Sequence, residues 1–133
     1  MLEGGCHCRA VRYRIDGEVL RHGLCHCTDC RGSAGAPVVS WIVLAEEQLE
    51  VTGDMITYAS SEHGRRDFCP RCGTSLFYRN AAAMPGLVDV ASATLDAPDL
   101  AAPPIEQINV VDRIGWMKSA HQLPEFEHFP PDL

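Results

Sequence analysis

Residues 69–74 of the chain are Cys69-Pro70-Arg71-Cys72-Gly73-Thr74, a C-x-x-C pair followed by a glycine. This pattern is typical of a zinc knuckle, a turn whose amides point at cysteine sulfurs and whose glycine supplies a positive φ. A second close pair, Cys6-His7-Cys8, lies near the N-terminus. Together the two pairs supply four thiolates, so we expect a structural zinc that ties the N-terminus to the middle of the chain.

A third group of cysteines lies in the stretch Cys25-His26-Cys27-Thr28-Asp29-Cys30. Zinc normally takes four ligands, so three thiolates leave one position for a water or a substrate, as in catalytic zinc sites. The spacing leaves three interpretations open: an open zinc, reactive thiols without a metal, or a closed zinc whose fourth ligand is a histidine (His7, His22, His26 or His63). We expect His26 to point away from the metal, because it lies between two ligands of one turn. Asp29 is either a proton acceptor near the fourth position or a partner of amides in its own turn.

The length of 133 residues predicts one domain spanning 1–133, and no run approaches the ~20 apolar residues that a membrane span needs. The first residues, Met-Leu-Glu-Gly-Gly-Cys, have neither the basic nor the apolar region of a secretory signal, so we expect a cytoplasmic protein. An odd number of cysteines, seven, in a reducing compartment favours metal ligands over disulfides.

The net charge of −7 is unevenly distributed, because residues 1–31 and 61–79 together carry +3. These two segments hold all seven cysteines. Their arginines either offset the charge of metal-bound thiolates, which is the more general need, or meet an anionic substrate. An acidic chain without a basic run argues against nucleic acid as a partner, and we expect no membrane partner either.

The hydrophobic pattern predicts a mainly β protein with no helix longer than two turns. Predicted strands cover residues 10–15, 18–24, 38–44, 49–52, 56–58, 75–78, 87–91 and 105–111. Asp16-Gly17 and Gly53-Asp54 are typical of hairpin turns. The first hairpin would place the two N-terminal cysteine groups at its two ends, so we expect the two metals to be neighbours.

Three segments lack a regular pattern. Residues 31–37 are rich in glycine and predict either a flexible approach to a ligand at the open metal or a mere linker. Residues 92–104 predict an irregular loop with one helical turn at most. The tail from Trp116 onward combines aromatic residues with prolines, and we expect it to wrap over the sheet. Both tryptophans, Trp41 and Trp116, are expected in the core.

The ordered motifs resemble a known family. They are Gly5-Cys6-His7-Cys8 followed by Ala10-Val11-Arg12-Tyr13, then Cys25-His26-Cys27-x-x-Cys30-Arg31, then Phe68-Cys69-x-x-Cys72-Gly73-Thr74. This order is similar to the glutathione-dependent formaldehyde-activating enzyme family, which includes centromere protein V. The match spans roughly residues 4–79 and places all seven cysteines on motif positions. Arg9 departs from the family pattern, which has glycine there, so we expect a different turn beside the first pair.

The resemblance implies twisted antiparallel sheets of the Mss4-like, or β-tent, fold. It implies two zincs per chain: a structural zinc on Cys6, Cys8, Cys69 and Cys72, and a catalytic zinc on Cys25, Cys27 and Cys30. It also implies a carbon–sulfur lyase related to S-(hydroxymethyl)glutathione synthase, acting on a small thiol such as glutathione and an aldehyde such as formaldehyde.

The expected chemistry begins with a thiol that loses its proton at the open zinc position and then adds to the aldehyde carbonyl. Arg31, Arg65 and Arg66 would receive the carboxylates of a thiol such as glutathione. The alternative is a non-catalytic module in which two zincs hold a surface for protein contact. A cleft beside Cys30 would favour the enzyme, whereas a fourth protein ligand at that zinc would favour the module.

Overall fold

The computed structural model describes residues 1–132, in which ten strands form two sheets. The smaller sheet has the antiparallel order β1-β2-β5 and the larger has the order β10-β3-β4-β9-β8-β7-β6. The strands are β1 (Leu2–Gly5), β2 (Arg12–Ile15), β3 (Arg21–Cys25), β4 (Val39–Ala45), β5 (Leu49–Thr52), β6 (Ile56–Ala59), β7 (Gly64–Phe68), β8 (Ser75–Asn80), β9 (Leu87–Ala91) and β10 (Glu106–Ile108). The chain is therefore mainly β, as the sequence predicts.

The larger sheet buries side chains on both of its faces. On one face, Ile42 and Leu44 of β4 pack with Tyr13 and Ile15 of the smaller sheet, and this core also contains Phe77. On the other face, Trp41 of β4 packs with buried cysteines near α1 (Thr28–Ala34). Because successive side chains of a strand point to opposite faces, a strand buried on both sides needs the nearly continuous apolar run of residues 38–44.

Both predicted hairpins are wrong, although the strands that flank them exist. β2 pairs with β1 and β5, whereas β3 pairs with β4 and β10. β5 likewise belongs to the smaller sheet and β6 to the larger. The chain crosses between sheets at Gly53, where φ is +99° and a Cβ atom would lie 2.2 Å from the carbonyl oxygen of Ala10. The turn residues thus lie where the chain passes from one sheet to the other. A local turn pattern does not determine which strands pair with each other.

The glycine-rich segment after Cys30 is partly helical, because its first part belongs to helix α1. The Sγ of Cys27 accepts a hydrogen bond from the backbone N–H of Cys30 at 3.3 Å and so caps the helix. Gly35 ends α1 in the left-handed conformation at φ +64°. The other helical segments are 3₁₀ turns: Glu46–Gln48, Ser92–Thr94, Pro98–Leu100, Val110–Asp112 and Gly115–Gln122.

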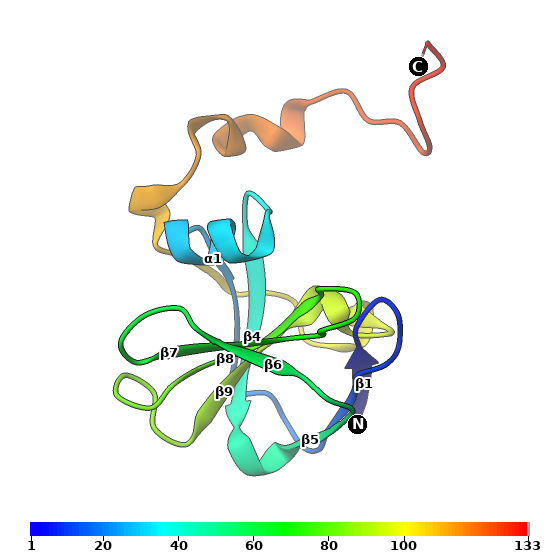
Figure 1. Ribbon diagram of the computed structural model, residues 1–133. Helices are drawn as coiled ribbons and strands as arrows, with labels where there is room; N and C mark the ends of the chain where they lie inside the picture. The colour runs from blue at the N-terminus through cyan, green and yellow to red at the C-terminus, as the bar shows by residue number, and fades with distance from the viewer. Residues whose placement is uncertain (133) are drawn as a thin grey trace.

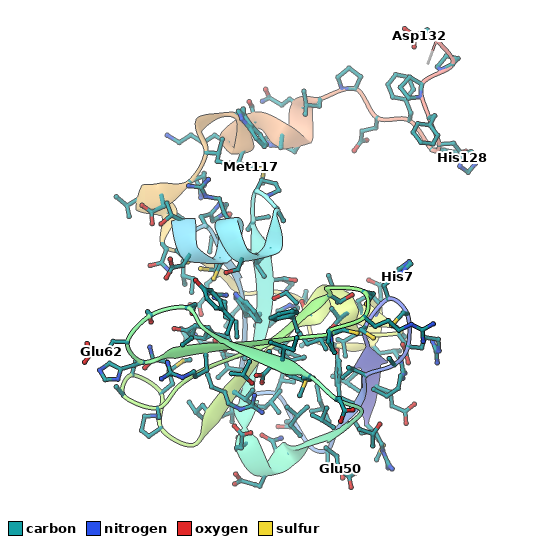
Figure 2. The ribbon with its side chains drawn as sticks, in the orientation of Figure 1. His7, Glu50, Glu62, Met117, His128 and Asp132 are labelled. Carbon is teal, nitrogen blue, oxygen red and sulfur yellow. The ribbon has the colours of Figure 1, made fainter. Side chains whose placement is uncertain are left out.

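The C-terminal part of the chain departs most from expectation. The last predicted strand shrinks to β10, which is parallel to β3. Beyond it the chain does not wrap over the sheet: Met117, His128 and Asp132 lie on an arm that leaves the body beyond α1 (Figure 1, Figure 2). Trp41 is buried as expected, but Trp116 is 60% exposed and is not part of the core. Within residues 1–132, no helix has the length and hydropathy to cross a membrane.

Candidate metal centres

The four-cysteine site joins the turn after β1 to the turn between β7 and β8. The sulfur atoms of Cys6, Cys8, Cys69 and Cys72 all lie within 4.8 Å of one another. The Sγ of Cys8 lies 3.6 Å from that of Cys6 and 3.7 Å from that of Cys69. A tetrahedral zinc with Zn–S bonds of about 2.3 Å separates its sulfurs by about 3.8 Å, so this donor set fits that ion.

Backbone amides hold the sulfurs of this site in place. The Sγ of Cys6 accepts from the N–H of Val11 at 3.2 Å, and the Sγ of Cys69 accepts from Arg71 at 3.4 Å and Cys72 at 3.5 Å. Cys6 and Cys69 are buried in the core between the sheets. Arg9, which follows Cys8, has φ +69°, in the left-handed region that favours glycine. The turn therefore has the backbone conformation that a glycine at this position would readily adopt. A metal here would therefore join the two sheets.

The three-cysteine site lies between the end of β3 and the first turn of α1. The sulfurs of Cys25, Cys27 and Cys30 lie within 4.8 Å of one another, and Cys25 and Cys30 are buried against Trp41. The hydrogen bond with Cys30 lowers the pKa of Cys25 to about 5, and the same contact raises the pKa of Cys30. The pair thus favours one thiolate, on Cys25, which the thiol of Cys30 stabilises.

None of the histidines in residues 1–132 belongs to either cysteine group. His26 is buried, and its Nε2 lies 2.8 Å from the Oε1 of Gln107 on β10, so it points away from the sulfurs as expected. His22 contacts the carbonyl of Ala102 and the hydroxyl of Ser92. His7 and His63 are exposed, and Figure 2 shows His7 pointing away from the body. Among the described residues, the three-cysteine site has no fourth protein ligand.

Three polar residues far away in the sequence surround the three-cysteine site. The side-chain amide of Asn109 donates to the Sγ of Cys25 at 3.4 Å, and Nη2 of Arg66 donates to the Sγ of Cys30 at 3.6 Å. The third residue is Asp89 on β9, where burial raises the pKa of its carboxyl group to about 6. The negative charge of Cys25 raises that pKa further and Arg66 opposes it. These contacts show that β7, β9 and the segment after β10 all contribute to the site.

A cavity of about 700 Å³ opens beside α1, within the range typical of small-molecule sites. Its lining comes from α1 (Thr28, Asp29, Gly32, Ser33), from β6 and the following loop (Ile56, Thr57, Tyr58, Ser60), and from Arg66, Phe68, Gly73 and Ser75. A second cavity of about 390 Å³ is lined by Ser33 and Ala34 of α1 and by Cys72 of the knuckle. The two cysteine sites thus border adjoining cavities, although no hairpin connects them.

Sequence patterns anticipated the cysteines but only part of their surroundings. Of the three arginines expected to receive carboxylates, Arg66 lines the larger cavity. Arg31 donates to the carbonyl of His26, and Arg65 donates to carbonyls of its own hairpin loop. Asn109 and Asp89 were not anticipated, because no spacing relates them to the cysteines. A weak signal was available for Asp89, which is a lone acidic residue within the apolar strand β9.

The fold and the two cysteine groups define a small β protein with two candidate metal centres made of thiols. The family model for the glutathione-dependent formaldehyde-activating enzyme matches residues 1–110. The chain therefore belongs to this family. The match includes all seven cysteines and ends before the C-terminal arm.

Individual relatives agree with this assignment. The chain is 31% identical over 130 residues to a putative glutathione-dependent formaldehyde-activating enzyme of Halomonas elongata, covering 89% of this chain and 80% of that protein. It is 30% identical over 76 residues to an uncharacterized lyase of Schizosaccharomyces pombe, covering 57% of this chain and 56% of that protein. The chain thus spans just over half the length of the yeast relative.

A solved structure supports the fold. The crystal structure of a Rhodobacter sphaeroides protein, a structural genomics target, superposes with a TM-score of 0.59 at 22% sequence identity. The superposition covers 79% of this chain and 98% of that protein. At this level of identity the likeness establishes a shared fold.

Proposed function

We propose that the chain binds two zinc ions and is a carbon–sulfur lyase that forms or cleaves the adduct of a small thiol and an aldehyde. The observation that carries the proposal is the three-cysteine site beside a cavity large enough for a tripeptide thiol. The family and the names of the relatives support glutathione as the thiol and formaldehyde as the aldehyde. Cys6, Cys8, Cys69 and Cys72 would hold the structural zinc, and Cys25, Cys27 and Cys30 the catalytic one.

The residues of the chain would prepare the thiol for reaction. Zinc bound by Cys25, Cys27 and Cys30 would lower the pKa of a coordinated thiol and so supply a thiolate at neutral pH. The cavity wall would hold the aldehyde beside this thiolate, which raises the effective concentration of both reactants. The new carbon–sulfur bond forms as the carbonyl electron pair moves to oxygen. This oxygen then takes up the proton that the thiol released, giving an S-hydroxyalkyl thioether.

Calorimetric titration of glutathione into the wild type and Cys27→Ser tests the proposal. We expect binding to the wild type that is lost in the variant, because the serine removes one of three local ligands. Formaldehyde is then added, and formation of the S-hydroxymethyl adduct is followed above its uncatalysed rate. Binding without acceleration would contradict formaldehyde as the substrate. A wild type that binds no small thiol would instead favour a non-catalytic module for protein contact.

A further inference from the structure

Arg66 on β7 is a buried arginine that has no carboxylate partner among the ion pairs of residues 1–132. It is only 4% exposed, and its guanidinium carbon lies 4.7 Å from the centre of the Tyr78 ring. Its Nη2 contacts the Sγ of Cys30 at 3.6 Å, while its Nε is buried and donates to no acceptor in the described residues. Burying a cation without a full set of acceptors is costly, so such a group is expected to have a specific role.

Two of the other three unpartnered polar atoms belong to residues near the same place. Within residues 1–132, four buried side-chain polar atoms have no hydrogen-bond partner: Nδ1 of His26, Oγ of Ser60, Nε of Arg66 and Oδ1 of Asp89. Arg66 and Ser60 both line the larger cavity. Asp89 is close enough to Cys25 for its pKa to respond to that thiol, whereas His26 contacts Gln107 and points away from the sulfurs. Three of the four residues with unpartnered atoms therefore lie beside the cavity or the three-cysteine site.

The sheet fixes the position of Arg66 relative to its neighbours. In the strand register, Arg66 is opposite Tyr78, and Tyr78 is opposite Asp89, so the three side chains share the face that carries Trp41. Tyr78 lies between the arginine and the acid, which keeps Asp89 from forming a direct ion pair with Arg66. The cation therefore remains available to a ligand in the cavity.

We infer that Arg66 binds the oxygen that becomes negative when the thiolate adds to the aldehyde, and is thus a catalytic residue. This inference rests on the proposed function. The guanidinium contacts Cys30, one of the three proposed zinc ligands, so it lies beside the position where a zinc-bound thiol would react. In the adduct, the oxygen that becomes negative is two bonds from the sulfur of that thiol. In the addition step the carbon–sulfur bond forms, the carbonyl electron pair moves to oxygen, and Arg66 donates an N–H to this oxygen until it gains the proton released by the thiol. Collapse of the adduct follows the same path in reverse.

Two small thiols test the inference by calorimetric binding. Thioglycolate carries an anionic oxygen close to its sulfur, whereas 2-mercaptoethanol is similar in size and neutral. We expect the zinc-loaded wild type to bind thioglycolate at least about tenfold more tightly, because a charge-assisted hydrogen bond forms in one complex alone. Arg66→Gln should remove this preference, and its kcat for adduct formation should fall about 100-fold while KM for the thiol changes little. Arg66→Lys should keep part of the preference, because it keeps the charge.

Arg65→Gln is the matched control, since Arg65 is the adjacent arginine and bonds its own hairpin loop. This variant should keep the wild-type preference, which excludes a general attraction between anions and the basic segment. Zinc content and melting curves confirm that each variant is folded, and Arg66→Met, which also removes the charge, replaces Arg66→Gln if the latter is not folded. Equal affinity of the wild type for the two thiols, or a preference that survives in Arg66→Gln, overturns the inference alone. A wild type that binds neither thiol overturns the proposed function, and the inference with it.

Discussion

Replacing Cys69 with serine should unfold the chain. Cys69 is fully buried, and its sulfur contacts that of Cys8 at 3.7 Å across 61 residues of sequence. A structural zinc contributes on the order of 10 kcal/mol, which is comparable with the roughly 5–15 kcal/mol that stabilises a whole domain. Losing one of the four ligands would thus remove most of the free energy of unfolding and the proposed crosslink between the two sheets.

Cys27→Ser is the matched variant. It also removes one sulfur ligand, but the site that it disrupts joins only residues that are close in sequence. Cys27 and Cys30 are three residues apart, and the dependence of loop entropy on length makes the Cys8–Cys69 crosslink more stabilising by about 3 kcal/mol. A serine oxygen can still accept the N–H of Cys30, so α1 should keep its cap. We expect this variant to remain folded with one equivalent of metal instead of two.

Metal analysis by mass spectrometry and urea unfolding followed by circular dichroism compare the three proteins. We expect a large loss of cooperative unfolding in Cys69→Ser and a midpoint close to that of the wild type in Cys27→Ser. An unchanged midpoint in Cys69→Ser would refute the structural role of the four-cysteine site. Equal unfolding of both variants would refute the division between a structural and a local site.

Three further predictions concern stability. Burial raises the pKa of Asp89 from 3.8 to about 6, so between these values the folded form holds a proton that the unfolded form loses. The free energy of unfolding should therefore fall as the pH rises from about 4 to 6. Urea unfolding at several pH values measures this dependence, and Asp89→Asn should remove it. Gly53→Ala should cost more than about 2 kcal/mol by the same assay, because the new Cβ meets the carbonyl of Ala10 at a positive φ; a wild-type midpoint would contradict the crossing described here. Trp41→Ala should cost about 3–5 kcal/mol and Trp116→Ala less than about 0.5 kcal/mol, and thermal melts that rank them equally would contradict the exposed position of Trp116.

Local patterns predicted most strands but not their partners. Val11, Tyr13 and Ile15 alternate with polar residues, and all three are buried in the core. Gly53 lies in a turn between two strands, as predicted, yet these strands belong to different sheets. Strand pairing depends on contacts distant in sequence, so a turn signal that describes four residues does not determine it.

The candidate site shows the same division between local and distant information. The close spacing of Cys25, Cys27 and Cys30 was sufficient to predict that their sulfurs lie together. The helix that begins there was missed because Gly32 and Ser33 have low helix propensity, whereas the cap provided by Cys27 depends on the folded backbone. Asn109 reaches Cys25 across 84 residues, a contact that no pattern within the motif encodes.

The placement of the three-cysteine site on six consecutive residues has a consequence for divergence within the family. If Cys6, Cys8, Cys69 and Cys72 hold the structural metal as proposed, substitutions between Cys25 and Cys30 would alter the proposed reactive centre without removing the crosslink between the sheets. A duplicated gene would then lose the proposed catalysis in a single step and still encode a folded protein. A non-catalytic descendant would keep Cys6, Cys8, Cys69 and Cys72 while residues 25–30 vary freely, and this pattern of substitution would distinguish it from an enzyme.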